Sequence, residues 1–414
     1  MSKEIRIGVF GMSRGASYYE MFKKEDAFEI VAVCERRAGC VKDIIEKNEV
    51  PVFADFDEFL AYGKEHGMNA VFLANFFNEH APYAIKVMEA GMAAISETLP
   101  ASTLKEAVGL VRCYERTGSK YMFAENYPFM PGNLELKRLV DSGTLGSAMY
   151  FEGEYNHHDR GFELKARTRG KYHWRNWEPR AYYITHSLGP IMYMTNSSPR
   201  YVSGHAAYSM IQAQDNKFRP INDGMAMMLC EFDNGTIGRF SGCNGVMYNK
   251  LYRVLGDKGS AEYGLGHGDS VRLSYYSTWK PELEPSESIY TPVPAKLDPQ
   301  MAKAVGAGHG GSDYIVVQKM IEYLRDGKEP FFDVYRAAEM SAAAVLGWRS
   351  CLNHGENFRI PDFRKEEERK TVEDDDLTPF KKADGTGNTV PVALNIAEDW
   401  EDYWGPDEPG IVTE

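Results

Sequence analysis

The chain has 414 residues, of which 43% are hydrophobic and 13% aromatic, so it is long enough for two or three domains with real cores. Its 60 Asp and Glu residues against 47 Lys and Arg give a net charge of −13, which repels nucleic acid backbones and anionic lipid surfaces. No export signal is evident at the start, and no apolar run approaches the ~18 residues of a membrane helix. We therefore expect a cytoplasmic protein with no nucleic acid or membrane partner.

Short apolar runs alternate with amphipathic stretches through the first part of the chain. Strands are expected at residues 5–10, 29–34, 70–74, 93–96 and 121–124. Helices are expected around residues 18–24, 41–47, 57–66, 82–90, 104–116 and 132–140. This alternation is typical of βαβ units and predicts a Rossmann doubly wound parallel sheet.

Longer alternating runs follow, at residues 148–155, 225–232 and 236–241. The last two flank Asp233-Asn234-Gly235, a hairpin signal, so we expect a second α/β domain with an open, mostly antiparallel sheet. Residues 278–310 suggest an irregular excursion, and helices are expected at 313–325 and 334–352.

Three regions are predicted. They are an NAD-binding Rossmann domain at 1–126, a substrate and oligomerisation domain at 127–362 with a return segment packing on the first domain, and an acidic extension at 363–414. The highly charged part of the extension, 363–376, is expected to be solvated. Its apolar end is expected to dock on its own domain or on a neighbouring subunit.

The turn after the first strand carries a dinucleotide fingerprint. Gly11-x-Ser13-x-x-Ala16 matches G-x-G-x-x-G/A with serine at the middle position, between a predicted strand and helix. We expect Gly11, Ser13 and Gly15 to line the cofactor phosphates, and Arg14 could add a positive charge. A plain tight turn is the alternative.

Polar residues at the ends of the other strands extend this site. Glu35 follows the second strand, where an acid hydrogen-bonds the adenosine ribose and favours NAD over NADP, although Arg36 and Arg37 soften that preference. His80 and Glu97 also lie at carboxyl ends of strands, where open α/β sheets bind ligands. Solvated charge and ordinary loop polarity are the alternatives.

Several motifs resemble the Gfo/Idh/MocA oxidoreductase family over residues 4–362. They are Gly11–Ala16, Asn75–His80, Ser96–Pro100, Ala124–Tyr127 and Ser142–Gly146. The resemblance implies bound NAD, with Asn75 and Asn126 among its contacts, and a second domain whose open sheet carries a sugar site and often an oligomer contact. A homo-oligomer is therefore expected. The family's catalytic lysine is absent, because Thr98 or Leu99 fills its position.

The second domain resembles the family's NAD-dependent glycosidase branch, typified by α-N-acetylgalactosaminidase. The matching motifs are Tyr183-Ile-Thr-His186, Tyr155-Asn-His157, His173-Trp-Arg175, Glu125-Asn126, Tyr248 and His309-Gly-Gly-Ser-Asp313. The spacing around His173–Tyr183 is shorter than in that branch, so its N-acetylated sugar is not transferred to this chain.

These motifs suggest how an alcohol could be oxidised without the lysine. We expect Tyr183 to be the base, assisted by His186, because a phenol with a pKa near ~10 needs a cation or strong donor to act at neutral pH. Glu125, Tyr155, His157, Arg175 and Tyr248 are expected to hold the sugar. No metal is expected, because the neighbours His157 and His158 on a strand point to opposite faces.

The predicted function is oxidation of a secondary hydroxyl, at C3 of a pyranose glycoside, by tightly bound NAD that could be recycled. One alternative is a redox-neutral glycosidase that oxidises, eliminates and reduces. Another is a non-catalytic NAD or sugar sensor, for which the missing lysine is the main support.

Overall fold

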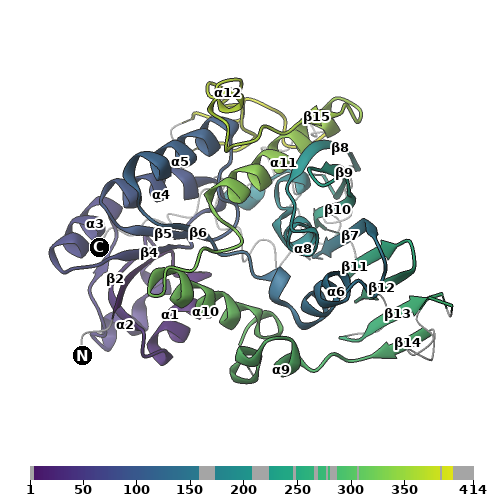
Figure 1. Ribbon diagram of the computed structural model, residues 1–414. Coiled ribbons are helices and arrows are strands. Elements are labelled where there is room, and N and C mark those ends of the chain that lie inside the picture. Colours follow the sequence, from purple (N-terminus) through teal and green to yellow (C-terminus); the bar gives the residue numbers. More distant parts are fainter. Residues whose placement is uncertain are drawn as a thin grey trace, which may run out of the picture.

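The computed structural model describes residues 4–394 except 158–172, 208–222, 246–248, 265–268, 277, 280–286, 305–306 and 383–384. Tyr248, His158 and the apolar end of the extension therefore lie outside the described residues. Two sheets lie side by side, each with helices packed against it (Figure 1). The predicted fold class, a Rossmann sheet plus a mostly antiparallel α/β domain, is confirmed.

The first sheet is parallel and has the strand order β3-β2-β1-β4-β5-β6. Its strands are β1 Ile5–Phe10, β2 Phe28–Cys34, β3 Val52–Phe53, β4 Ala70–Leu73, β5 Ala93–Ser96 and β6 Tyr121–Phe123. Only β3 was not predicted, because two residues give no readable pattern. The strand order changes direction between β1 and β4, which is where such folds open a ligand crevice.

Helices cover both faces of this sheet. They are α1 Gly15–Lys24, α2 Lys42–Glu46, α3 Phe56–Glu65, α4 His80–Glu89 and α5 Leu104–Thr117. Helix α6, Pro131–Asp141, instead packs against the second sheet. Helix α1 begins at Gly15, whereas the prediction placed its start at residue 18. It begins earlier because the fingerprint turn leads directly into it. The side chain of Asp55 caps α3 by accepting from the backbone N–H groups of Asp57 and Glu58.

The second sheet has nine strands among the described residues, in the order β14-β13-β12-β11-β7-β10-β9-β8-β15. They are β7 Ala148–Asn156, β8 Pro199–Ala207, β9 Met225–Phe232, β10 Ile237–Asn244, β11 Asn249–Gly256, β12 Gly259–Tyr263, β13 Val271–Tyr275, β14 Glu287–Tyr290 and β15 Phe358–Arg359. The predicted β9–β10 hairpin is confirmed by the antiparallel pairing of Glu231 with Ile237. Among the described strands of this second sheet, only the β7–β10 pair is parallel.

Three helices pack on one face of this sheet, α6, α8 Thr185–Thr195 and α11 Val334–Leu352. Helix α8 crosses β7 so closely that a Cβ on Gly153 would lie 2.2 Å from the carbonyl oxygen of Ser187. This close crossing brings the motif at the start of α8 next to the strand that carries Tyr155.

The region predicted to be irregular contains regular structure. Residues 287–303 form β14, the short helix α9 Pro294–Leu297 and a helical turn at Pro299–Lys303, so that prediction was wrong there. Pro and polar residues hide these short elements because neither gives a periodic pattern. Helix α10, Ser312–Leu324, then returns to the Rossmann sheet, and Ile315 and Val316 join the apolar core that contains Ile7 and Val9.

The charged segment after residue 362 is packed against the protein rather than fully solvated. Arg112 of α5 pairs with Glu366 at 2.6 Å and with Glu373 at 2.5 Å. Arg369 is only 4% exposed and pairs with Glu115. The expectation of a solvated segment fails because its charges have partners on α5, which no local pattern reveals.

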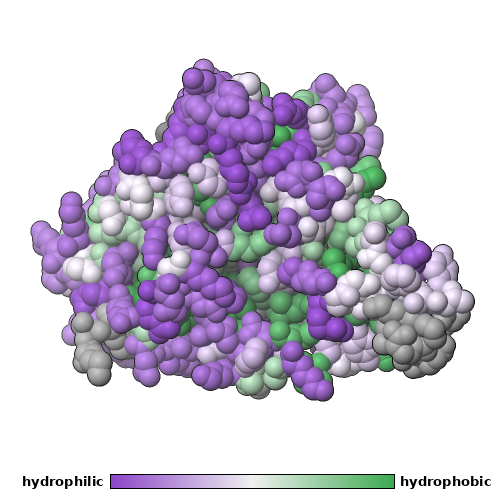
Figure 2. All heavy atoms as spheres, in the orientation of Figure 1, coloured by the Kyte–Doolittle hydropathy of each residue, from purple (hydrophilic) through white to green (hydrophobic). Residues whose placement is uncertain are grey.

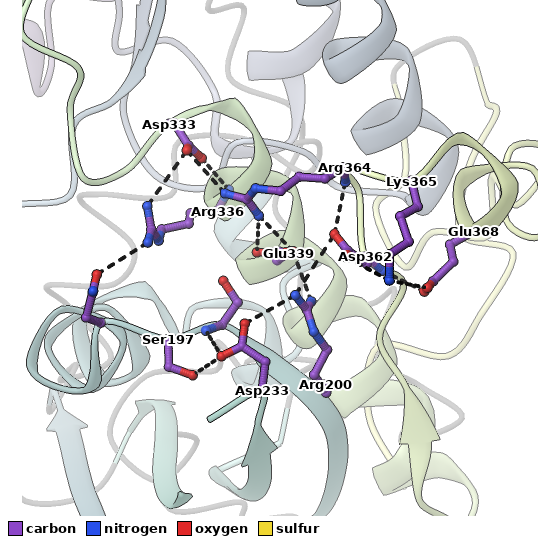
Figure 3. Close-up of polar contacts among 12 residues, drawn as sticks. Ser197, Arg200, Asp233, Asp333, Arg336, Glu339, Asp362, Arg364, Lys365 and Glu368 are labelled. Carbon is purple, nitrogen blue, oxygen red and sulfur yellow. Dashed lines mark hydrogen bonds and ion pairs between the residues drawn. The ribbon is translucent and has the colours of Figure 1, made fainter. Parts of the chain in front are cut away.

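A buried carboxylate ties the same segment to α11. The side chain of Glu339 is fully buried and pairs with Arg200 of β8 at 2.9 Å and with Arg364 at 3.3 Å (Figure 3). Asp333 accepts from Arg364 as well. The network joins β8, α11 and the start of the extension.

The surface in Figure 2 is mainly hydrophilic, with hydrophobic residues visible mostly in the middle, between the two halves of the molecule. None of the helices in the described part of the chain is both long enough and apolar enough to cross a bilayer.

Candidate active site

The fingerprint turn has the backbone geometry that a dinucleotide requires. Gly11 has a φ of +90°, and a Cβ there would lie 2.4 Å from the carbonyl oxygen of Ala74. The N–H of Gly15 donates to the carbonyl of Gly11, which closes the turn at the start of α1. Ser13 is exposed on the turn. A helix N-terminus preceded by such a turn is suited to bind phosphate groups.

Glu35 lies where an adenosine ribose is expected. Its side chain is buried at the end of β2, and it accepts from the backbone N–H of Met12 at 2.7 Å and of Arg37 at 2.9 Å. Arg36 points toward solvent and donates to the hydroxyl of Tyr83. The acid therefore faces the fingerprint turn, and the neighbouring Arg37, rather than Arg36, pairs with it at 3.2 Å.

Arg14 is engaged differently from the sequence-based expectation. Its guanidinium donates to Asp313 at 2.8 and 3.0 Å and to Glu97 at 2.9 Å. Two carboxylates already balance its charge, so it is not a free cation for phosphate. Nothing in the local sequence reveals Asp313, which lies 299 residues away.

The remaining predicted cofactor residues meet at the carboxyl edge of β4, β5 and β6. The buried Oδ1 of Asn126 and the amide of Asn75 have no hydrogen-bond partner among the described residues. His80 is not in a loop as predicted: it is the buried first residue of α4, and its Nδ1 bonds the carbonyl of Leu99 at 2.9 Å. Burial lowers the pKa of His80 to about 4.

Unpartnered buried polar atoms at this edge, together with Glu35 and the Gly11 turn, fit an extended dinucleotide. The adenosine half would lie at Glu35 and the phosphates at residues 11–15. The nicotinamide half would lie toward Asn75, Glu97 and Asn126.

Three side chains at the start of α8 form a continuous hydrogen-bonded chain. The hydroxyl of Tyr183 lies 3.2 Å from Nε2 of His186, and Nδ1 of His186 lies 2.9 Å from Oε1 of Glu125. The Glu125 side chain is fully buried and also accepts from the backbone N–H of Tyr127. The carboxylate therefore keeps the proton of His186 on Nδ1, which leaves Nε2 to accept the Tyr183 proton.

Aromatic rings fix the orientation of this imidazole. Tyr127 stacks on His186 with ring centres 4.0 Å apart, while Tyr155 meets its edge at 4.9 Å. The hydroxyl of Tyr252 donates to the carbonyl of His186. Neither Tyr127 nor Tyr252 was predicted as part of the site.

The structure modifies the predicted role of Tyr183 as the base. Burial raises the pKa of Tyr183 well above its ordinary value, and Arg175 opposes this effect. Tyr183 is thus a neutral phenol at rest, and its hydroxyl can donate to Nε2 of His186.

Aromatic groups and one cation border the relay. Phe77 stacks on Trp174 at 4.8 Å and on Tyr183 at 5.4 Å. The guanidinium of Arg175 lies 4.3 Å from the Trp174 ring centre. Trp174 therefore contacts both Phe77 and Arg175.

The remaining predicted sugar contacts lie in the same region. The rings of Tyr155 and His157 lie 5.9 Å apart at the end of β7. His173 is buried and accepts from the backbone N–H of Arg175, and burial lowers its pKa to about 3. Lys250, which sequence reasoning missed, pairs in register with Tyr155, and its ammonium lies 5.5 Å from the Tyr127 ring centre. Only the strand register reveals it.

Comparisons with known proteins agree with this geometry. Residues 5–125 match the family described as "Oxidoreductase family, NAD-binding Rossmann fold". The first domain is therefore similar to the NAD-binding domain of Gfo/Idh/MocA oxidoreductases, and the predicted cofactor, NAD, is confirmed at this level. Residues 247–370 match "Glycosyl hydrolase 109, C-terminal domain", which confirms the resemblance to the glycosidase branch.

The chain is similar over most of its length to glycosyl hydrolase family 109 proteins. It is 26% identical to one from Shewanella sp. strain ANA-3, and 26% identical to the α-N-acetylgalactosaminidase of Shewanella oneidensis. Each match covers 87% of this chain and 85% of the relative. A levoglucosan dehydrogenase solved with NADH and levoglucosan shares the fold, with a TM-score of 0.71, 15% identity, and coverage of 86% of this chain and 99% of that one.

Proposed function

We propose that this protein oxidises a secondary hydroxyl, at C3 of a pyranose glycoside, with NAD as the hydride acceptor. The observation that carries the proposal is the Tyr183–His186–Glu125 chain, which ends beside the carboxyl edge where the cofactor residues meet. NAD, when bound, accepts the hydride from the carbinol carbon. The chain's own residues must take the hydroxyl proton and hold the ring.

Proton transfer follows from the resting arrangement. His186 Nε2 takes the Tyr183 proton while Tyr183 takes the proton of the sugar hydroxyl, so the charge ends on the imidazolium beside Glu125. The buried carboxylate stabilises that imidazolium without being protonated. In this scheme Tyr183, His186 and Glu125 together take the place of the catalytic lysine of related dehydrogenases.

Sugar contacts are assigned to the groups around the relay. We propose that Tyr155, His157 and Arg175 bind the ring hydroxyls, and Tyr248 remains part of this prediction. Glu125 is better placed to orient His186, because both of its oxygens face His186 and the Tyr127 N–H. Phe77 and Trp174 exclude water from the Tyr183 side.

The test is Tyr183→Phe. Formation of the keto-glycoside should fall by roughly 10²- to 10⁴-fold, the usual contribution of general acid–base catalysis, while bound NAD is retained. Trp279→Phe, an exposed aromatic substitution far from α8, is the matched control. Unchanged turnover in Tyr183→Phe would remove the relay from the mechanism.

A redox-neutral glycosidase is the second candidate, favoured by the match of residues 247–370. A C3 ketone acidifies the C2 hydrogen, so the anomeric substituent can leave without an oxocarbenium ion and without a carboxylate pair. Turnover in heavy water separates the two reactions. Deuterium at C2 of a released sugar without net NADH supports the glycosidase, whereas a keto-glycoside without release supports the oxidase.

The sensor alternative predicts ligand binding without turnover on any sugar. The relay argues against it, because a buried Glu–His–Tyr chain supplies more proton chemistry than binding requires.

We also propose self-association through the open face of the second sheet. Leu229 and Ile237 are 47% and 43% exposed there, beside a charge row in which Glu152 pairs with Arg239 and Arg253. A row of both signs is complementary to a second copy of itself. Sedimentation velocity tests this: Leu229→Glu with Ile237→Glu should yield monomers, and a monomeric wild type would contradict it.

A further inference from the structure

The carboxylate of Asp313 collects four hydrogen bonds although its side chain is only 1% exposed. Arg14 donates twice, at 2.8 and 3.0 Å, Asn126 Nδ2 donates at 2.6 Å, and His309 Nδ1 lies 3.0 Å away. Burial alone would raise the pKa of Asp313, but the bonds from His309 and Arg14 outweigh it and hold the pKa well below its ordinary value. The group is thus an anion at the start of α10.

Asp313 joins segments that are far apart in sequence. Arg14 belongs to the fingerprint turn, Asn126 follows β6, and α10 lies against α1 (Figure 1). Arg14 in turn holds Glu97 at the end of β5. One carboxylate from the second half of the chain therefore fixes three residues at the cofactor edge.

The bond to Asn126 has a directional consequence. Because Nδ2 donates to Asp313, the opposite end of the amide, Oδ1, is turned away from the carboxylate. That oxygen is buried and has no hydrogen-bond partner among the described residues. A buried, unpartnered acceptor needs a donor, because an unmade hydrogen bond there is destabilising.

The sheet order says which end of a dinucleotide meets this acceptor. Glu35 follows β2 on one side of the β1 turn, whereas Asn126 follows β6 on the other. With the adenosine ribose at Glu35 and the phosphates at the turn, the nicotinamide half extends toward Asn126. Its ribose hydroxyls and carboxamide N–H are donors.

We propose that Asp313 is a positioning residue for the nicotinamide half of NAD. It orients the Asn126 amide so that Oδ1 accepts a hydrogen bond from the nicotinamide half. It also holds the Arg14 guanidinium beside Glu97, away from the cofactor phosphates. The proposal needs only NAD binding and is independent of the sugar or the reaction.

Binding experiments test it on the full chain. NADH binding is followed by its fluorescence, and ADP, which lacks the nicotinamide half, is measured as a competitor. Asp313→Asn should weaken NADH binding about 10- to 100-fold, as expected for a lost charge-assisted contact, and leave ADP within about twofold. Glu35→Gln is the matched control and should weaken both ligands alike.

A second variant keeps the test decisive. Asn126→Ala should reproduce the NADH-selective loss, and adding Asp313→Asn to it should cause little further loss because both act through one contact. Equal weakening of NADH and ADP by Asp313→Asn would overturn the proposal, as would unchanged or tighter NADH binding. If Asp313→Asn does not fold, Asn126→Ala alone decides: unchanged NADH affinity would overturn the proposal.

Discussion

The hydroxyl groups of Thr98 and Thr185 lie 2.7 Å apart, and both are buried. Thr98 is one of the two residues that could fill the position of the missing lysine, and Thr185 is the first residue of α8, adjacent to His186. The loop after β5 is therefore tied to the helix that carries the relay. A neutral contact between the two domains occupies the place where a base is expected.

Replacing Thr98 by Val removes this bond while conserving shape. We expect unfolding to become easier by about 1–2 kcal/mol, because Thr185 is left with an unpaired buried hydroxyl. The double variant with Thr185→Val should be less destabilised than the sum of the singles, by about 1 kcal/mol in urea unfolding. Strict additivity would show that the two hydroxyl groups do not interact.

Glu125→Gln tests the orienting carboxylate. Gln cannot stabilise the imidazolium, so we expect turnover to fall roughly 10²- to 10⁴-fold while NADH affinity is unchanged. Glu154→Gln, a carboxylate on β7 that pairs with Arg239, serves as the control and should leave turnover unchanged. Full activity in Glu125→Gln would mean that His186 needs no anionic partner.

Glu35 should set the preference for NAD. Its carboxylate repels a 2′-phosphate, so Glu35→Ser should narrow the ratio of NAD to NADP affinity by at least about tenfold, with Arg36 and Arg37 then able to pair the phosphate. Calorimetric titration with both cofactors measures it. Glu29→Ser, on the same strand but paired with Arg6, should not alter the ratio.

His80 predicts a pH dependence of stability. Its folded pKa, about 4, lies below the unfolded value of 6.5, so the unfolded state binds its proton first as pH falls. The contribution of His80 is complete above pH 6.5 and is lost between 6.5 and 4, with a slope of up to about 1.4 kcal/mol per pH unit. His80→Gln should flatten the curve across this range, whereas substitution of the exposed His66 should not. If the free energy of unfolding changed with pH in the same way for wild type and His80→Gln, this would contradict the lowered pKa assigned to His80.

We expect the buried carboxylate of Glu339 to contribute strongly to the free energy of unfolding. Glu339→Ala removes the buried carboxylate that Arg200 and Arg364 share, while Asp233 and Asp333 still pair with them. We expect a loss of about 3 kcal/mol, at the lower end for broken buried pairs because both arginines reach water and keep another partner. Glu89→Ala removes an exposed pair with Arg116 and should cost less than about 1 kcal/mol. Thermal unfolding of both variants gives the comparison, and equal effects would count against the buried network.

Local patterns were sufficient for most of the fold. Apolar runs located five of the six Rossmann strands, and the Asn234-Gly235 turn located a hairpin of the second sheet. They failed for β3 and for six strands of the second sheet, which are β8 and β11 to β15. Of these, β3, β14 and β15 are too short to give a readable pattern. They also failed for residues 363–376, whose charges look solvated until α5 supplies partners.

The site was only partly visible in the sequence. Motifs identified Tyr183, His186 and Glu125 as individual residues, and Tyr183 and His186 are close in sequence. The bond from His186 to Glu125 spans 61 residues and the one from Arg14 to Asp313 spans 299, so neither follows from periodicity. The structure therefore assigns Glu125 and Arg14 partners that the motifs did not.

The segment that follows residue 362 has a mechanical consequence. It is anchored to α5 through Arg112 and to α11 through the paired Arg349 and Asp375, and its Phe380 packs on Phe77, the ring that stacks on Tyr183. Moving the two domains apart would require breaking the contacts of this segment with both α5 and α11. The ring of Tyr183 is thereby linked through Phe77 to the segment that holds α5 and α11 together.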